Sequence, residues 1–189
     1  MDFSSFKLAE QQVNARGAKF CPLFANSHQV QLTLGSKANP LSTQWGPSSF
    51  DQAQNVTRRN MDFVCTPQME DELKKLDDWT VEYVEQNCQR LFGKTLTKAQ
   101  VADGYKPSCT ERGDYPKQLR CKINLQGPRE IRCWDEHGQP REQPLEWKRC
   151  KFVARVTLSH LWVMSKEFGW VFNITDLQIF EERHDCPFV

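Results

Sequence analysis

The chain has 189 residues, of which 39% are hydrophobic and 26% charged, and its formal net charge is +1. These values suit one globular domain with a hydrophobic core of its own. The first residues do not combine a basic stretch with an apolar one, and no run of 18 apolar residues occurs, which excludes a secretory signal and a transmembrane helix.

An intracellular, reducing compartment is therefore the expected location, and the eight cysteines are expected to be free thiols, mostly buried. The chain has no Cys-x-x-Cys pair. The nearest approaches to a metal motif are Cys133 with His137 and His184 with Cys186, and neither spacing repeats as it does in a zinc finger. The sequence thus predicts neither a metal nor a cofactor.

Strand candidates separated by turns fill the first third of the chain. Residues 6–13 form a weak one, whereas apolar and polar residues alternate strictly over 29–34, as on a half-buried strand. Residues 35–50 are rich in turn formers but carry large aromatic residues, Trp45 among them, which indicates an ordered loop rather than a linker. A third strand is predicted over 58–65.

One long helix is predicted over residues 67–92. Thr66 is placed to cap it, and Pro67 occupies the first helical position, where its missing N–H costs nothing. Apolar residues recur at steps of three and four, forming one stripe for a core, and Gly93 ends the helix. A shorter helix, capped by its first residue, is predicted over 97–103.

Strands return after residue 104, over about 118–126, 129–134, 150–164 and 169–181. Strands, a helix and a closing set of strands form the element order of an OB-fold. The predicted fold class is therefore mainly β: a five-stranded Greek-key OB barrel, with the long helix between strands 3 and 4 and an additional hairpin or edge strand. A single domain is expected over 1–182, with a short tail over 183–189.

Charge is distributed unevenly along the chain. Residues 62–90 hold eight acids and three bases, whereas residues 105–155 hold twelve bases and seven acids. In the later strands, Lys and Arg alternate with apolar residues, so a sheet is expected that is apolar beneath and basic and aromatic above. Such a face suits a single-stranded nucleic acid, because cations neutralise phosphates and rings stack on unpaired bases.

The candidate binding residues are cations and rings of these strands and of the loop 105–117 that precedes them, together with two residues from the first third of the chain. They are Trp45, Arg58, Tyr105, Lys106, Lys117, Arg120, Lys122, Arg132, Trp134, Lys151 and Arg155. For each cation the alternative is a solvated sheet face, and for each ring it is packing in the core. Trp162 shares its strand face with Phe152 and Val156, so it is expected in the core.

Two other functions are left open. Asp114, Asp135, Glu136 and His137 could form a metal-dependent nuclease centre, but residues 135–138 are typical of a turn, and no P-loop or HExxH motif occurs. An enzyme is therefore not expected. The other alternative is a non-catalytic structural or protein-interaction module, which would use the acidic helix as its contact surface.

Several short segments, in the same order over about residues 28–182, resemble one family. They are Gly46-Pro47-Ser48-Ser49-Phe50, Leu76-Asp77-Asp78-Trp79, Leu91-Phe92-Gly93-Lys94, Tyr105-Lys106-Pro107 with Gly113-Asp114-Tyr115-Pro116, and Leu161-Trp162-Val163 with Phe168-Gly169-Trp170. The family is that of the phage-type single-stranded DNA-binding proteins found in large DNA viruses of eukaryotes and in algal and protist genomes. The resemblance implies an OB-fold that coats single strands during DNA replication, recombination and repair, in a nucleus or at a viral replication site.

The expected partner is single-stranded DNA bound without sequence preference, and no membrane. The phage relatives end in a strongly acidic tail with an aromatic residue, which competes with DNA and recruits replication enzymes. Residues 181–189 are only mildly acidic, with Phe188 near the end. Replication proteins recruited by this tail, and a homodimer, are therefore left open.

Overall fold

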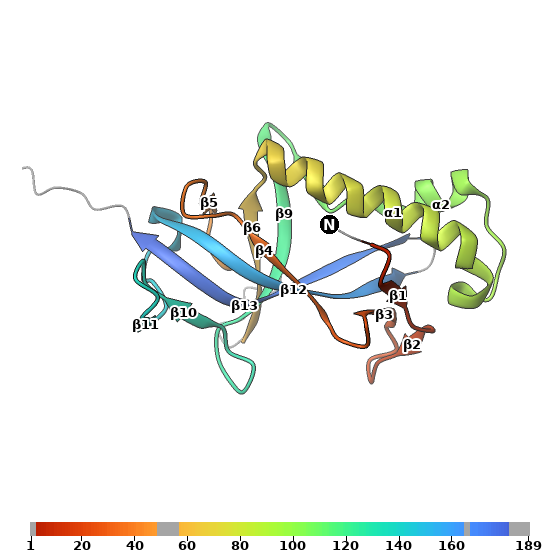
Figure 1. The fold of residues 1–189 in the computed structure, drawn as a ribbon, viewed down its shortest axis with the longest axis horizontal. Helices are drawn as coiled ribbons and strands as arrows, with labels where there is room; N and C mark the ends of the chain where they lie inside the picture. Colours follow the sequence, from red (N-terminus) through yellow and green to blue (C-terminus); the bar gives the residue numbers. More distant parts are fainter. Residues whose placement is uncertain (1–2, 49–56, 165–166, 182–189) are drawn as a thin grey trace, which may run out of the picture.

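Two long strands, β12 (Cys150–Met164) and β13 (Glu167–Glu181), form the hairpin on which the other strands assemble (Figure 1). The structure is a computed structural model and describes residues 3–48, 57–164 and 167–181. The protein is mainly β in these residues. The hairpin runs along most of the molecule in Figure 1, and α2 and the end of α1 extend past its right-hand end. The other strands pair with the hairpin either directly or through one intervening strand.

The free edge of β12 pairs in turn with three strands from the start of the chain: β3 (Lys19–Ala25), β4 (Val30–Leu34) and β5 (Leu41–Ser42). The free edge of β13 pairs, all in parallel, with β7 (Tyr105–Lys106), β9 (Tyr115–Asn124) and β10 (Arg132–Trp134). β9 also pairs with β6 (Arg58–Val64) and β8 (Cys109–Arg112). The bridges Thr43↔Phe63 and Ser48↔Asn60 connect β6 back to the segment that follows β5.

The remaining elements are short. β1 (Phe6–Leu8) and β2 (Gln12–Val13) both pair with β3, and β11 (Pro140–Arg141) pairs with β10. A single 3-10 turn, η1 (Trp147–Arg149), leads into β12. The short helix α2 (Lys98–Gly104) leads into β7, and Thr97 caps it.

The long helix α1 (Pro67–Phe92) covers the apolar face of the sheet. The Thr66 hydroxyl accepts a hydrogen bond from the Met69 amide, and Gly93 ends the helix in the left-handed region at φ 69°. One stripe of the helix is buried: Met69, Leu73, Leu76, Thr80, Val84, Cys88 and Leu91. In the middle of this contact the Trp170 indole N–H donates to the Thr80 hydroxyl over 2.8 Å, which ties the helix to β13.

The strand register assigns each side chain to one of the two faces of the sheet. Successive residues of a strand point to opposite faces, and residues paired across neighbouring strands point to the same face. The face that α1 covers, here the inner face, carries buried residues such as Phe63, Cys121, Phe152 and Phe172. The other side, here the outer face, carries the residues between them. On β13 these include Val171, Asn173, Asp176 and Gln178, with the residues paired to them on β9, β10 and β12.

The main elements predicted from the sequence are present. The 67–92 helix and the 150–164 strand have the predicted bounds, and the strand predicted over 6–13 is divided into β1 and β2. β3 was not predicted, because Pro22 interrupts it and Phe20 and Phe24 break its alternation. The two-residue β5 was not predicted either, because it lies within the segment 35–50 that was expected to be a loop. As a result, six strands rather than three precede the helix in the described part of the chain. The predicted 183–189 tail lies outside the described residues.

Candidate nucleic-acid interface

Three predicted cations lie close together on the outer face where β6, β9 and β13 meet. Lys122 is opposite Asn60 on one side and opposite Asn173 on the other. The Arg58 guanidinium donates to the Asn173 amide oxygen over 2.8 Å, and the Lys122 ammonium donates to the Asn60 amide oxygen over 2.6 Å. Neither partner is an acid, so these two contacts orient the charges without neutralising them.

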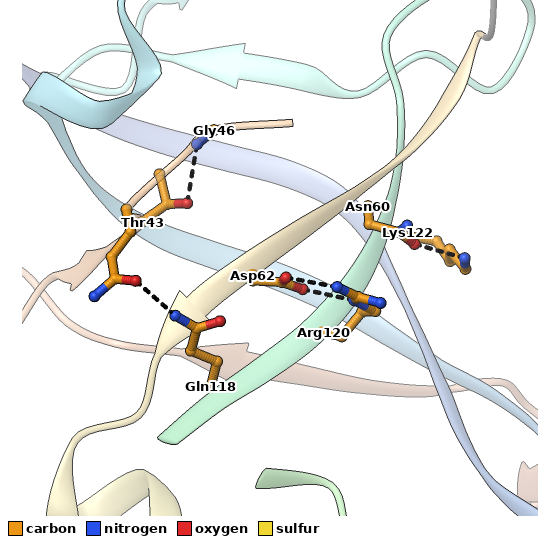
Figure 2. Close-up of polar contacts among 8 residues, drawn as sticks. Thr43, Gly46, Asn60, Asp62, Gln118, Arg120 and Lys122 are labelled. Carbon is orange, nitrogen blue, oxygen red and sulfur yellow. Dashed lines mark hydrogen bonds and ion pairs between the residues drawn. The ribbon is translucent and has the colours of Figure 1, made fainter. Parts of the chain in front are cut away.

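Arg120 lies next to Lys122 on the same face of β9. Unlike Lys122, Arg120 forms an ion pair with an acidic side chain. Its guanidinium makes two parallel hydrogen bonds of 2.8 Å to the two carboxylate oxygens of Asp62 (Figure 2). Figure 2 also shows the Lys122–Asn60 contact further along β9 and the Gln118 amide donating to the Gln44 side chain at the other end of the row. The row is thus pre-ordered, and Lys122 is the cation in it that forms no ion pair with the described residues.

Burial and, to a smaller extent, neighbouring positive charges lower the pKa values of this cluster. Burial lowers the pKa of the Lys122 ammonium, and the guanidiniums of Arg58 and Arg120 lower it further. The pKa of Arg58 is lowered by burial and then by Arg129, and the pKa of His160 is lowered by burial and then by Arg58. A bound anion would remove this mutual repulsion, so the cluster is suited to phosphate.

Beside the cluster lies a hollow of about 400 Å³, here the first hollow, in which a tryptophan meets the cations. Lys106, Arg120, Lys122 and Trp162 line it, and the Lys106 ammonium is paired with the Glu167 carboxylate at 2.6 Å. Trp162 lies opposite Gly169, where a Cβ atom would come within 3.1 Å of the indole. Gly169 thus leaves room for the half-buried indole against the β13 backbone.

The expectation that Trp162 belongs to the core is wrong, and a β-bulge explains why. The register between β12 and β13 shifts between Leu158 and His160, so the buried positions of β12 change from even to odd numbers. Leu161 is therefore buried and Trp162 is turned to the outer face. The bulge also brings His160 against Phe20 on this face, with ring centroids 5.1 Å apart.

A second hollow on the outer face gathers three more predicted residues, Arg132, Trp134 and Arg155. Asp176 stands between the first two: its carboxylate accepts from the Arg132 guanidinium at 2.7 Å and from the Trp134 indole N–H at 3.2 Å. Burial raises the pKa of Asp176, but the hydrogen bonds from Arg132, Thr175 and Trp134 outweigh this and leave it below its ordinary value. Arg155 is exposed and forms no ion pair with the described residues.

Two predicted residues lie elsewhere. Tyr105 is buried, packs against Phe168 and donates its hydroxyl to the Asp77 carboxylate over 2.6 Å, so its ring offers no stacking surface. Lys117 belongs to the inner side of β9 and pairs with Glu70 of α1 at 3.1 Å. Its odd number already separates it from Arg120 and Lys122, since side chains alternate along a strand.

The last two predicted residues lie further along the sheet. Lys151 is half-buried on the outer face, opposite Phe180 and Ser42. Trp45 is 68% exposed and contacts the half-exposed Tyr115 edge-on, with centroids 5.9 Å apart. Trp45 directly follows Gln44, whose side-chain oxygen accepts a hydrogen bond from the Gln118 amide at 2.9 Å.

The alternative nuclease residues do not form a metal centre. Asp135 accepts hydrogen bonds from the His137 and Gln139 amides at 2.9 and 2.8 Å, so it stabilises the turn between β10 and β11. Asp114 lies in a different turn, between β8 and β9. Within residues 3–48, 57–164 and 167–181, no three His, Cys, Asp or Glu side chains are grouped to hold a metal ion. In the same residues, no helix is long and apolar enough to span a membrane.

No protein-family model matches the sequence, and no curated protein matches it either. Among solved structures, the chain is similar to the single-stranded DNA-binding protein from bacteriophage Enc34 in complex with ssDNA, with a TM-score of 0.49 and 10% identity over 97% of this chain and 99% of that one. A second structure of the single-stranded DNA-binding protein from bacteriophage Enc34 gives a TM-score of 0.44 and 11% identity over 97% and 93%, and its C-terminal truncation gives 0.49 and 9% over 95% and 98%.

Proposed function

We propose that the protein binds single-stranded DNA across the outer face, without sequence preference. The observation that carries the proposal is the first hollow, where Lys122 lies with Arg120 and the indole of Trp162 and forms no ion pair with the described residues. Arg58 lies close enough to act on the Lys122 charge. Cations and a ring in one hollow match the two parts of an unpaired nucleotide, its phosphate and its base. No base-specific pattern of donors and acceptors is required, because every base has a stacking face.

The two hollows are expected to bind successive parts of one DNA strand. Asn60 and Asn173 hold Lys122 and Arg58 in place for phosphate contacts, so little side-chain freedom is lost on binding. Trp162 supplies the stacking surface, worth roughly 1–3 kcal/mol for one base. The second hollow lies about five residues away along β13, roughly 16 Å, and offers Arg155 and Trp134 to the next part of the strand.

The strand order supports an OB-type barrel as part of this proposal. From β5 the neighbours run to β12, β13, β9 and β6, and the Thr43↔Phe63 bridge leads back toward β5. In an OB barrel of this order, α1 would follow the second barrel strand, β6. Coating of single strands in replication, recombination and repair, without catalysis, is the role we propose for such a domain.

The test is a titration with fluorescently labelled oligothymidylate, followed by anisotropy. The parent protein should bind saturably, ignore duplex competitor and lose affinity with salt along a straight log–log line. Trp162→Ala should weaken binding by about 5- to 150-fold, which corresponds to the loss of roughly 1–3 kcal/mol of stacking, and Trp162→Phe should restore most of it. Matched RNA oligomers would reveal any preference for the sugar.

Trp147 provides a control, since its half-buried ring stacks on the buried Phe152 and lines neither of the two hollows. Trp147→Phe should leave affinity unchanged. A parent protein that shows no saturable binding would instead favour a scaffold or interaction module. If Trp162→Ala is folded and binds like the parent, the first hollow is not the site.

A further inference from the structure

A third hollow lies at the tip of the β12–β13 hairpin, and Trp162 lines it as well as the first hollow. It is the larger of the two, with a volume of about 680 Å³, and is here called the tip hollow. Three segments contribute to it: the loop between β2 and β3, the residues after α1, and the ends of β12 and β13. None of the eleven residues predicted from the sequence lies in its lining.

The charges of the tip hollow are positive and uncompensated. Arg16, Lys19 and Lys94 line it, and none of them forms an ion pair with the described residues. The one acid in the lining, Glu167, is already paired with Lys106 at 2.6 Å. By contrast, Arg120 and Arg132 on the outer face are each held by an acid. The tip hollow therefore has cations that are more available to an anionic partner.

The loop that carries Arg16 is ordered by its own side chains. The Asn14 amide oxygen accepts hydrogen bonds from the backbone N–H groups of Arg16 and Ala18 at 2.9 and 3.0 Å, and Gly17 takes the positive φ of 79° that the turn requires. Lys94 directly follows the α1 C-cap, and Lys19 begins β3 and is paired with Val163 of β12. All three cations therefore lie on ordered backbone.

The floor of the tip hollow is apolar. Phe92 and Phe168 lie with their ring centroids 5.6 Å apart, and Leu96 and Val163 complete the lining beside them. Met164 at the rim is 63% exposed. Cations around an apolar, partly aromatic floor repeat the chemistry of the first hollow, and Trp162 makes the two surfaces continuous.

We propose that a bound single strand continues past Trp162 into the tip hollow, where Arg16, Lys19 and Lys94 bind its phosphates. This inference rests on the proposed function and extends the interface beyond the outer face. The outer-face stretch from Gly169 to Gln178 spans roughly 30 Å at about 3.3 Å per residue. Only oligonucleotides longer than this stretch would reach the tip hollow, so its contribution depends on length.

The experiment compares oligothymidylates of about 5 and about 12 nucleotides, within the range known for such domains. The parent should bind the longer one more tightly. The double variant R16E/K94E should lose at least tenfold in affinity for the longer oligonucleotide and less than twofold for the shorter one. Its salt slope for the longer oligonucleotide should fall by about 0.7 for each lost phosphate contact.

The matched control is K7E/K74E, which makes the same change in net charge at two exposed lysines of β1 and α1. It should weaken both lengths alike and only slightly, and circular dichroism should show that both double variants are folded. Equal affinities of parent and R16E/K94E at both lengths, or equal losses at both lengths, would overturn the proposed path while leaving the outer-face function standing. A parent that binds neither length would refute the function itself.

Discussion

Lys122 shows how a binding residue can lower the stability of its own fold. Its ammonium is half-buried among the guanidiniums of Arg58 and Arg120, and its pKa is lowered by burial and by both neighbours. The folded protein therefore binds this proton less tightly than the unfolded chain does. The cost to stability is present at every pH below the lowered pKa and disappears as the pH rises through the unfolded value of about 10.4.

Lys122→Met should consequently raise the melting temperature at pH 7, because it keeps the aliphatic part of the side chain and removes the charge. The gain should shrink when the measurement is repeated at pH 10. The same variant should bind oligothymidylate more weakly, with a salt slope smaller by about 0.7. Lys98→Met, at an exposed position of α2, is the control and should change none of these. A lower melting temperature for Lys122→Met at pH 7 would contradict the charge argument.

At this scale the sequence predicted which side chains share a strand face better than which side chains are buried. Alternation along β9 placed Arg120 and Lys122 on one face, and it could also have separated Lys117 from them. The burial of Tyr105 could not be predicted from alternation, because it depends on a hydrogen bond from the Tyr105 hydroxyl to Asp77, which lies on α1, 28 residues earlier in the chain. Trp162 was missed because a bulge changes which positions point inward, and a bulge leaves no clear sign in a single sequence.

Among the elements, α1 was the most predictable, because its signals are local. The cap, the first proline, the apolar stripe and the terminal glycine all lie within the segment or next to it. The strand β3 and the two-residue strand β7 have no local start or stop signals, and both pair with strands far away in the chain. Their positions are therefore set by tertiary pairing rather than by local sequence.

Thr66→Ala tests the contribution of the cap to α1. The Thr66 hydroxyl accepts from the Met69 amide at 3.3 Å, and its loss should cost about 0.5–2 kcal/mol. For a protein of this size the melting temperature should fall by about 2–4 °C for each kcal/mol. Thr66→Ser, which retains the hydroxyl, should melt close to the parent. Equal melting of the alanine and serine variants would show that the hydroxyl does not stabilise the helix.

For the molecule as a whole, the contact between Trp170 and Thr80 joins the long helix α1 to the β12–β13 hairpin. The Thr80 hydroxyl accepts from the indole N–H at 2.8 Å and donates to the Leu76 carbonyl at 2.6 Å, and both side chains are buried. The helix is thus fixed to the hairpin by a polar contact inside an apolar interface. The same hairpin carries the outer-face residues on its opposite side.

Thr80→Val keeps the shape of the side chain but leaves the Trp170 N–H buried without a partner. An unsatisfied buried donor costs about 1–3 kcal/mol, so urea unfolding should shift to a lower midpoint with an unchanged slope. Thr95→Val, at an exposed position, is the control and should unfold like the parent. A midpoint for Thr80→Val equal to that of the control would mean that the indole finds another acceptor.

The position of the β12–β13 hairpin near the end of the described chain affects how the protein is made. β4 and β7 pair only with this hairpin among the described strands, so both wait without a partner until residues 150–181 have left the ribosome. Until then the nascent chain exposes apolar residues such as Met61 and Leu119. Folding during translation must therefore finish late, and chains cut short before residue 150 should be retained by chaperones or aggregate.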